Sequence, residues 1–232
     1  MSNNNKTLVN VSQPGTVTNF HSKPGKSNDL FDLTNKLHFM KTLKNPDIKD
    51  QDGPKDWILC RADDDENSQW SMEFYKDTES MERHFNDKEI EDNHDDIINL
   101  MNDQPMRDMI HPVYSNTTSG GFSSISSTQP GVILKFQAKA GRGEELFEIT
   151  NKLHYMKTLD TPTQIDTDGP SDWILCRSKS DPDVLWGLEF YRDESSMKRH
   201  FDDSQIESNH SSIIELLEDK PVRVPVHKVF AG

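Results

Sequence analysis

The chain of 232 residues has few cysteines, few basic residues and no long apolar run, and each of these shortages excludes a class of protein. Two cysteines are too few for a disulfide scaffold. No run approaches the roughly 18 apolar residues of a membrane span, and the N-terminus lacks the basic and apolar segments of a secretion signal. Basic residues are also scarce, because 26 Lys and Arg stand against 40 Asp and Glu, for a net charge of −14. That charge disfavours nucleic acid and membrane partners. Together with the missing secretion signal and membrane span, the composition leads us to expect a cytoplasmic protein.

Apolar residues make up only 32% of the chain, and the mean hydropathy is −0.83. Such polarity is typical of disorder, but 4 Trp and 11 Phe indicate a packed core. Motifs for bound groups are missing too. The sequence has no glycine-rich phosphate loop, no dinucleotide fingerprint and no tight spacing of metal ligands. We therefore predict no cofactor and no metal.

The sequence contains the same unit twice. DGPKDWILCR (52–61) returns as DGPSDWILCR (168–177), and TNKLHFMKTL (34–43) returns as TNKLHYMKTL (150–159). The offset is constant at 116 positions (173 − 57 and 200 − 84), and roughly half of the matched residues are identical. We therefore predict an N-terminal tail (1–15), a first repeat (16–115), a flexible Ser/Gly/Thr linker (116–130) and a second repeat (131–232).

Each repeat alternates between strand and helix patterns. Residues 132–138 alternate with period 2, and apolar residues at 3–4 spacing then predict a helix. Two strands follow (172–177 and 186–191), then a helical region that Asp193 caps and that the pair Asp202–Asp203 interrupts, and a last strand (223–230). The order β-α-β-β-α-β predicts an α+β fold of two ferredoxin-like repeats.

A four-stranded sheet with both helices on one face leaves its other face uncovered. Two such faces can cover each other, so we predict an intramolecular pseudo-dimeric α+β barrel in which the two repeats pair, and further oligomerisation is left open. The alternative is two separate domains on a linker. Alternation along 70–75 puts Trp70 and Tyr75 on opposite faces. We expect the tyrosine and glutamate side to face the interior of the barrel, and the tryptophan side to pack under the helices.

The segments EFYKDTESMERHF (73–85) and EFYRDESSMKRHF (189–201) carry a family resemblance. A strand ending in an aromatic residue, an acidic turn and a helix carrying a histidine resemble the antibiotic biosynthesis monooxygenase-like family. Its members are dimeric α+β barrels, so this chain resembles a single-chain tandem version. The family includes cofactor-free oxygenases that convert phenols and hydroquinones to quinones, and also haem-degrading enzymes. His84 and His200 stand where the haem-degrading enzymes carry Trp, which disfavours that second activity.

Four histidines are the candidate catalytic residues. His84 and His200 lie at the edge of an apolar helical stripe, and His94 and His210 fit between isoleucines at spacings of three and four. Imidazole ordinarily titrates near neutrality, so it could remove the proton of a phenol and leave the electron-rich anion that reacts with O₂. The alternative for each histidine is a packing role with a satisfied hydrogen bond.

The candidate substrate-binding residues are expected to line a pocket for a flat aromatic molecule. They are Asn19, His21, Glu73, Tyr75, Glu189 and Tyr191. Lys135 and Gln137 replace Asn19 and His21 in the second repeat, which predicts two chemically unequal pockets. The sequence and the resemblance together predict a cofactor-independent monooxygenase that oxidises a small phenolic or hydroquinone-type molecule with O₂. The alternative is a non-catalytic small-molecule-binding or stress-related protein on the same scaffold.

Overall fold

The computed structural model describes residues 12–39, 50–92, 94–116, 121–155 and 168–232. The first repeat consists of β1 Gly15–His21, α1 Ser27–Phe39, β2 Asp56–Ala62, β3 Ser68–Phe74, α2 Thr78–Phe85, α3 Lys88–Asp92, α4 His94–Leu100 and β4 Met106–Asn116. A short 3₁₀ helix, η1 Gly121–Ser124, follows. The second repeat consists of β5 Gly131–Gln137, α5 Gly143–Tyr155, β6 Asp172–Ser178, β7 Val184–Phe190, α6 Glu194–Asp202, α7 Ser204–Leu216 and β8 Val222–Ala231.

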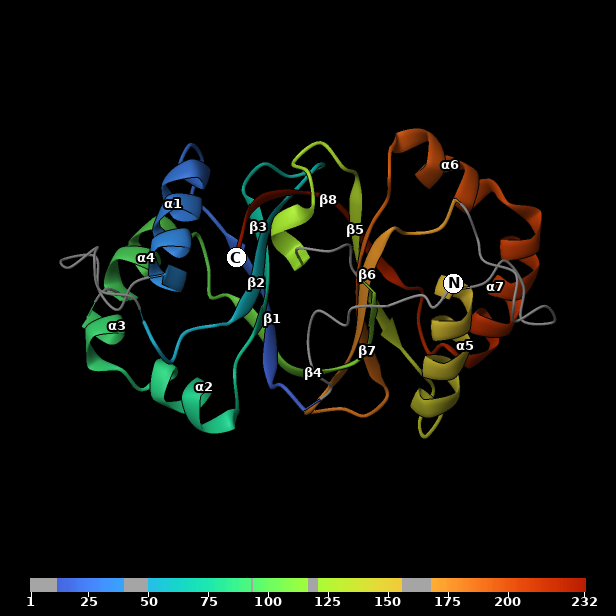
Figure 1. Cartoon of the computed structure of the whole chain (residues 1–232), viewed down its shortest axis with the longest axis horizontal. Helices are drawn as coiled ribbons and strands as arrows, with labels where there is room; N and C mark the ends of the chain where they lie inside the picture. The colour runs from blue at the N-terminus through green and yellow to red at the C-terminus, as the bar shows by residue number, and fades with distance from the viewer. Residues whose placement is uncertain (1–11, 40–49, 93, 117–120, 156–167) are drawn as a thin grey trace, which may run out of the picture.

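The strands of the two repeats form one closed barrel in the order β1-β3-β2-β8-β5-β7-β6-β4. The helices of the first repeat lie on one side of the barrel and those of the second on the opposite side (Figure 1). The predicted α+β barrel of two ferredoxin-like repeats is therefore confirmed, and the alternative of two separate domains is wrong.

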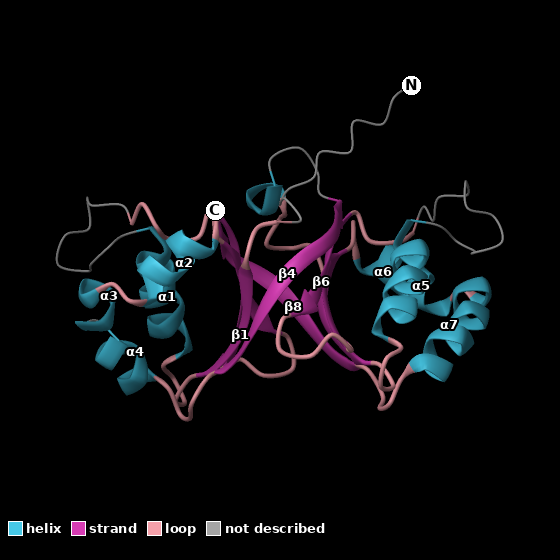
Figure 2. Ribbon diagram, turned by 90° about the horizontal axis from the view of Figure 1, so that it is seen from below, coloured by secondary structure: helices cyan, strands magenta, loops and turns pink. Residues whose placement is uncertain are grey.

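The last strand of each repeat joins the two sheets, because it changes partner halfway along. Ile110 in β4 lies opposite Gly15 of β1 and also opposite Ser178 of β6. Val226 in β8 lies opposite Gly131 of β5 and also opposite Ala62 of β2. Figure 2 shows β4 and β8 crossing at the centre of the molecule. This exchange pairs the edge strands β2 and β6, which would otherwise expose unpaired backbone groups.

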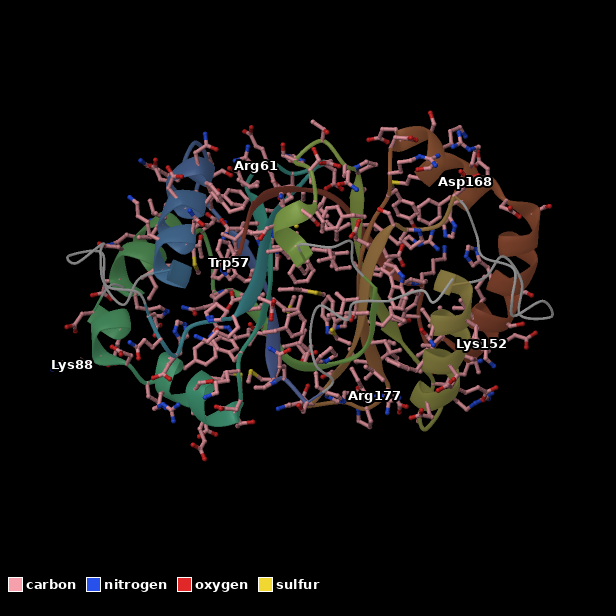
Figure 3. The ribbon with its side chains drawn as sticks, viewed as in Figure 1. Trp57, Arg61, Lys88, Lys152, Asp168 and Arg177 are labelled. Atoms are coloured by element: carbon pink, nitrogen blue, oxygen red, sulfur yellow. The ribbon has the colours of Figure 1, made fainter. Side chains whose placement is uncertain are left out.

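The interior of the barrel holds an apolar core. Trp70, Met72 and Phe74 of β3 share one apolar cluster with their counterparts of β7, and the ring centroids of Trp70 and Trp186 lie 6.2 Å apart. Burial of each large apolar side chain contributes about 1.5–3 kcal/mol. Figure 3 shows side chains filling the space between the two sheets. The expectation that the tryptophan side of β3 packs under the helices is therefore wrong.

The helices cover the outer face of each sheet. Leu30 and Leu37 of α1 pack with Ile97 of α4 in the first repeat, and α5 and α7 form the matching cluster in the second. The predicted cap is present: Asp193 accepts a hydrogen bond from the backbone N–H of Ser196 at 2.7 Å in a capping box. The helical region breaks where predicted, since α6 ends at Asp202 and α7 begins at Ser204. None of the described helices is long and apolar enough to cross a membrane.

Part of the predicted flexible linker is packed into the barrel. Phe122 of η1 and Ile125 just after it are 3% and 1% exposed and belong to the barrel core. The ring of Phe122 stacks on that of Phe74 with centroids 6.4 Å apart. The prediction of a flexible tract is thus wrong for residues 121–125, where apolar side chains cover the core.

We predict that Phe122→Ala lowers the free energy of unfolding by about 3–5 kcal/mol, because it removes a large ring from a packed core. Chemical denaturation measures this loss. The neighbouring exposed residue Ser123 provides the control, since Ser123→Ala should change the free energy by less than about 0.5 kcal/mol. Equal stability of the Phe122→Ala variant and the wild type would show that the linker does not pack against the barrel in solution.

Candidate functional site

Each repeat has a cavity between the outer face of its sheet and its helices. Ten lining residues of the first cavity have counterparts 116 positions later in the lining of the second (200 − 84 and 223 − 107). Six of these pairs are central to the site: in the first cavity Glu73, His84, Phe85, His94, Ile97 and Arg107, and in the second Glu189, His200, Phe201, His210, Ile213 and Arg223. The volumes are about 490 Å³ and about 140 Å³ respectively.

The first cavity contains a histidine paired with a buried carboxylate. The N-cap at Asp77 starts α2, and two turns later the helix directs His84 back toward the sheet. His84 is 8% exposed, and its Nδ1 lies 2.5 Å from a carboxylate oxygen of Asp50. Asp50 precedes the Asp-Gly-Pro turn and also accepts a hydrogen bond from the backbone N–H of Asp52 at 2.9 Å.

This environment keeps Asp50 ionised. Burial would raise its pKa, but the hydrogen bond and charge of His84 and the backbone N–H groups of Asp52 and Gly53 outweigh burial and lower the pKa. When His84 is neutral, a carboxylate at Nδ1 favours the tautomer in which Nδ1 carries the proton and Nε2 carries the lone pair. Nε2 has no hydrogen-bond partner among the residues that the structure describes, so it is the atom available to accept a proton.

A second polar pair lies beside this histidine. The hydroxyl of Tyr75 donates a hydrogen bond to Glu73 at 2.8 Å, and the ring of Tyr75 lies 5.5 Å from that of His84, centroid to centroid. Burial, followed by the charge of Glu73, raises the pKa of Tyr75 well above its ordinary value. Tyr75 therefore remains a protonated donor that holds the Glu73 carboxylate at the cavity wall.

The second repeat reproduces most of this arrangement. Tyr191 donates to Glu189 at 2.6 Å, and the rings of Tyr191 and His200 lie 5.5 Å apart. The counterpart of Asp50 is Asp166, which lies outside the described residues.

Aromatic and positively charged groups also line each cavity. The guanidinium of Arg107 lies 4.9 Å from the ring centroid of Phe85, and that of Arg223 lies 5.3 Å from the ring of Phe201. Each cavity thus combines an apolar surface with one arginine and one glutamate.

The predicted site residues fall into three groups in the structure. The four histidines and both glutamates line the cavities. Tyr75 and Tyr191 are 0% exposed and lie behind the glutamates rather than at the cavity wall. The expectation that tyrosine and glutamate face the barrel interior is wrong, because both belong to the helix side of the sheet.

Asn19 and His21 lie outside both cavities. Asn19 donates to the hydroxyl of Ser68 at 2.9 Å, on the strand face that points into the barrel. His21 is partly exposed near Asp65 and Asp103. The counterparts Lys135 and Gln137 are likewise absent from the lining, so the predicted inequality of the pockets cannot rest on these positions.

Sequence reasoning missed Asp50, Phe85 and Arg107. The signal was present, because all three are identical in the two repeats, and Asp50 belongs to a D-x-D-G-P segment that occurs in both (50–54 and 166–170). Only the fold shows that this segment reaches the helix that carries His84. No group of three or more His, Cys, Asp or Glu side chains within the described ranges could hold a metal ion.

The fold is shared with solved structures of similar length. A "putative monooxygenase" from Fusobacterium nucleatum superposes with a TM-score of 0.70 at 13% identity, over 96% of this chain and 95% of that chain. One of the same description from Lactobacillus acidophilus has a TM-score of 0.66 at 8% identity, over 95% and 96%. An anthrone oxidase-like protein has a TM-score of 0.65 at 9% identity, over 95% and 93%.

No family model and no curated protein sequence matches the chain. At these identities the similarity shows the fold alone.

We predict that Asp50→Asn lowers the free energy of unfolding at pH 7 by about 1.5–3 kcal/mol, because a hydrogen bond to a buried charge is lost. The pKa of Asp50 is lower in the folded protein than in the unfolded chain. Its contribution is therefore complete above the unfolded pKa and disappears as the pH falls through the folded one. Denaturation between pH 3 and pH 7 should show that the wild type loses more stability than the variant on acidification.

Asp64→Asn, at an exposed carboxylate, is the control for this measurement and should follow the wild type. Parallel curves for Asp50→Asn and the wild type would contradict the hydrogen bond between the Asp50 carboxylate and His84.

Proposed function

We propose that the protein is a cofactor-independent monooxygenase that oxidises a small phenolic or hydroquinone-type compound with O₂. The observation that carries the proposal is the pair of Asp50 and His84 at the wall of a cavity next to Glu73. A histidine oriented by a carboxylate is an arrangement suited to removing a proton near neutral pH. The fold shared with the two "putative monooxygenase" structures and the anthrone oxidase-like protein supports the same chemistry.

The first step is proton removal. Nε2 of His84 accepts the hydroxyl proton of the phenol and leaves a phenolate, and Asp50 stabilises the resulting imidazolium through Nδ1. Arg107 supplies positive charge in the same cavity and favours the phenolate over the neutral phenol. The low exposure of Asp50 and His84, 8% each, strengthens the interaction between them, whereas Arg107 is exposed and its charge is partly screened by solvent.

The second step is electron transfer from the substrate to O₂. The phenolate gives one electron to O₂, and the resulting superoxide and phenoxyl radical combine at a ring carbon that carries hydrogen, para to the oxygen in a phenol and ortho to it in a hydroquinone, to form a C–O bond. The peroxide takes a proton from the imidazolium, the ring carbon loses its hydrogen as a proton, and the O–O bond breaks. One oxygen atom stays as the carbonyl of the quinone and the other leaves as water. The substrate supplies all four electrons that reduce O₂.

The other cavity residues bind the aromatic molecule. Phe85 and Ile97 offer an apolar surface for a flat ring, and Glu73 accepts a hydrogen bond from a second hydroxyl while Tyr75 holds its carboxylate. His94, at the start of α4, lines the same cavity and is the second candidate for a proton-transferring group. His200, His210 and Glu189 have the corresponding roles in the second repeat.

We predict that replacing both candidate bases, as His84→Gln with His200→Gln, lowers the rate of oxygen consumption about 10²–10⁴-fold. The measurement is oxygen uptake with hydroquinone and with 1,8-dihydroxyanthrone, in the presence of a metal chelator and without added flavin. Asp50→Asn should reduce the contribution of the first site by a smaller factor, since it acts through His84.

His21→Gln is the matched control, because His21 is a histidine outside both cavities, and this variant should consume oxygen at the wild-type rate. Ligand binding by the wild type with no oxygen consumption for any phenol tested would replace the proposal with the non-catalytic binding function.

A further inference from the structure

The two cavities keep the same histidines and glutamates but differ in the sheet residues beneath them. On the helix side of β1 and β3, the first repeat has Thr16, Thr18, Gln69 and Ser71. The counterparts on β5 and β7 are Val132, Leu134, Leu185 and Gly187. Roughly half of all matched positions in the two repeats are identical, whereas these four all differ, and each polar side chain is replaced by an apolar residue or by glycine.

The central exchange involves two residues that face each other across neighbouring strands. Thr18 lies opposite Ser71 in the register of β1 and β3, and Leu134 lies opposite Gly187 in that of β5 and β7. A Cβ at position 187 would lie 3.4 Å from the Cβ of Leu134, which is an ordinary van der Waals contact. Leu134 lines the second cavity, whereas Thr18 does not reach the first. The leucine thus helps to fill the space that is open in the first repeat.

The polar residues of the first repeat support the cavity wall. Ser71 donates to the carboxylate of Glu73 at 3.0 Å, and the amide of Gln69 donates to Thr34, a lining residue, at 2.8 Å. Gly187 and Leu185 offer no such donors. Gln69 Oε1 and Thr16 Oγ1 are buried without a hydrogen-bond partner in the described part of the chain. A buried polar atom without a partner destabilises the folded state unless a ligand or water satisfies it.

We propose that the two cavities have different ligand specificities. In the first, Ser71 and Gln69 act through the lining residues Glu73 and Thr34, and in the second Leu134 fills part of the corresponding space. The first cavity, at about 490 Å³, lies within the 300–1,000 Å³ typical of small-molecule sites, and it takes the multi-ring hydroxylated compound. The second, at about 140 Å³, lies below that range and takes at most a single ring. This inference rests on the proposed function only for the phenolic class of ligand.

Binding measured without oxygen tests the specificity separately from catalysis. Calorimetric titration of the wild type with 1,8-dihydroxyanthrone under argon should give one molecule bound per chain. The double variant Thr18→Leu with Ser71→Gly gives the first repeat the residues that the second repeat has at these two positions. It should weaken anthrone binding at least about tenfold, equivalent to one lost hydrogen bond. The reverse variant, Leu134→Thr with Gly187→Ser, should add a second anthrone site.

Thermal unfolding and hydroquinone binding by the same variants provide the control for folding. Each variant should keep a cooperative unfolding transition and should still bind hydroquinone. Two equal anthrone sites in the wild type, or exchanges that leave the stoichiometry and affinity unchanged, would overturn the inference. If Thr18→Leu with Ser71→Gly fails to fold, the conservative variant Gln69→Leu replaces it and should lower anthrone affinity alone.

Oxygen uptake separates this inference from the proposed function. With anthrone, His84→Gln should lower turnover at least about tenfold more than His200→Gln does, because the first cavity binds this ligand. Equal losses from the two variants would contradict unequal sites while supporting oxygenase activity. Unequal binding with no turnover would contradict the oxygenase and leave the specificity in place.

Discussion

The exchange of the last strand between the repeats is the constraint on which the rest of the structure depends. Ile110 and Val226 each lie opposite residues of both repeats, so neither sheet can be completed without the other. The exchange brings the inner faces together and fills the barrel with the rings of Trp70, Trp186 and their neighbours. These side chains occupy the barrel side of each sheet, and both described cavities lie on the other side, beneath the helices.

This arrangement makes each cavity the property of one repeat. The residues lining the first come from positions 20–107, and those lining the second from positions 134–223. Pairing of the repeats thus supplies a shared core without mixing the two sites. Residues in the core, such as Trp70, must fit the partner repeat, whereas residues such as Ser71, on the other face, need only fit their own helices. Two sites on one stable scaffold can then diverge in size and polarity while the histidine and glutamate at each wall stay the same.

Much of the fold was predictable because each strand and helix pattern occurs twice in the sequence, once in each repeat. Period-2 strands, the caps at Asp77 and Asp193, and the break at Asp203 follow from local backbone chemistry, which neighbouring residues determine. Four histidines and two glutamates at the cavities were also within reach, since helix and strand periodicity place them beside apolar stripes. The prediction that Asn19 and His21 line a cavity was wrong. Asn19 lies on the barrel side of strand β1, and His21 lies at the exposed end of the same strand.

The sequence by itself determined which residues share a strand face or a helix face, and it determined that the repeats have the same fold. The tertiary structure alone decided which strand face points into the barrel. Alternation could not settle this, because both faces of each sheet are buried, one against the partner sheet and one against helices, so both carry apolar residues. It also decided that Asp50 meets His84, 34 residues away in the chain, because that contact depends on how the turn before β2 packs against α2.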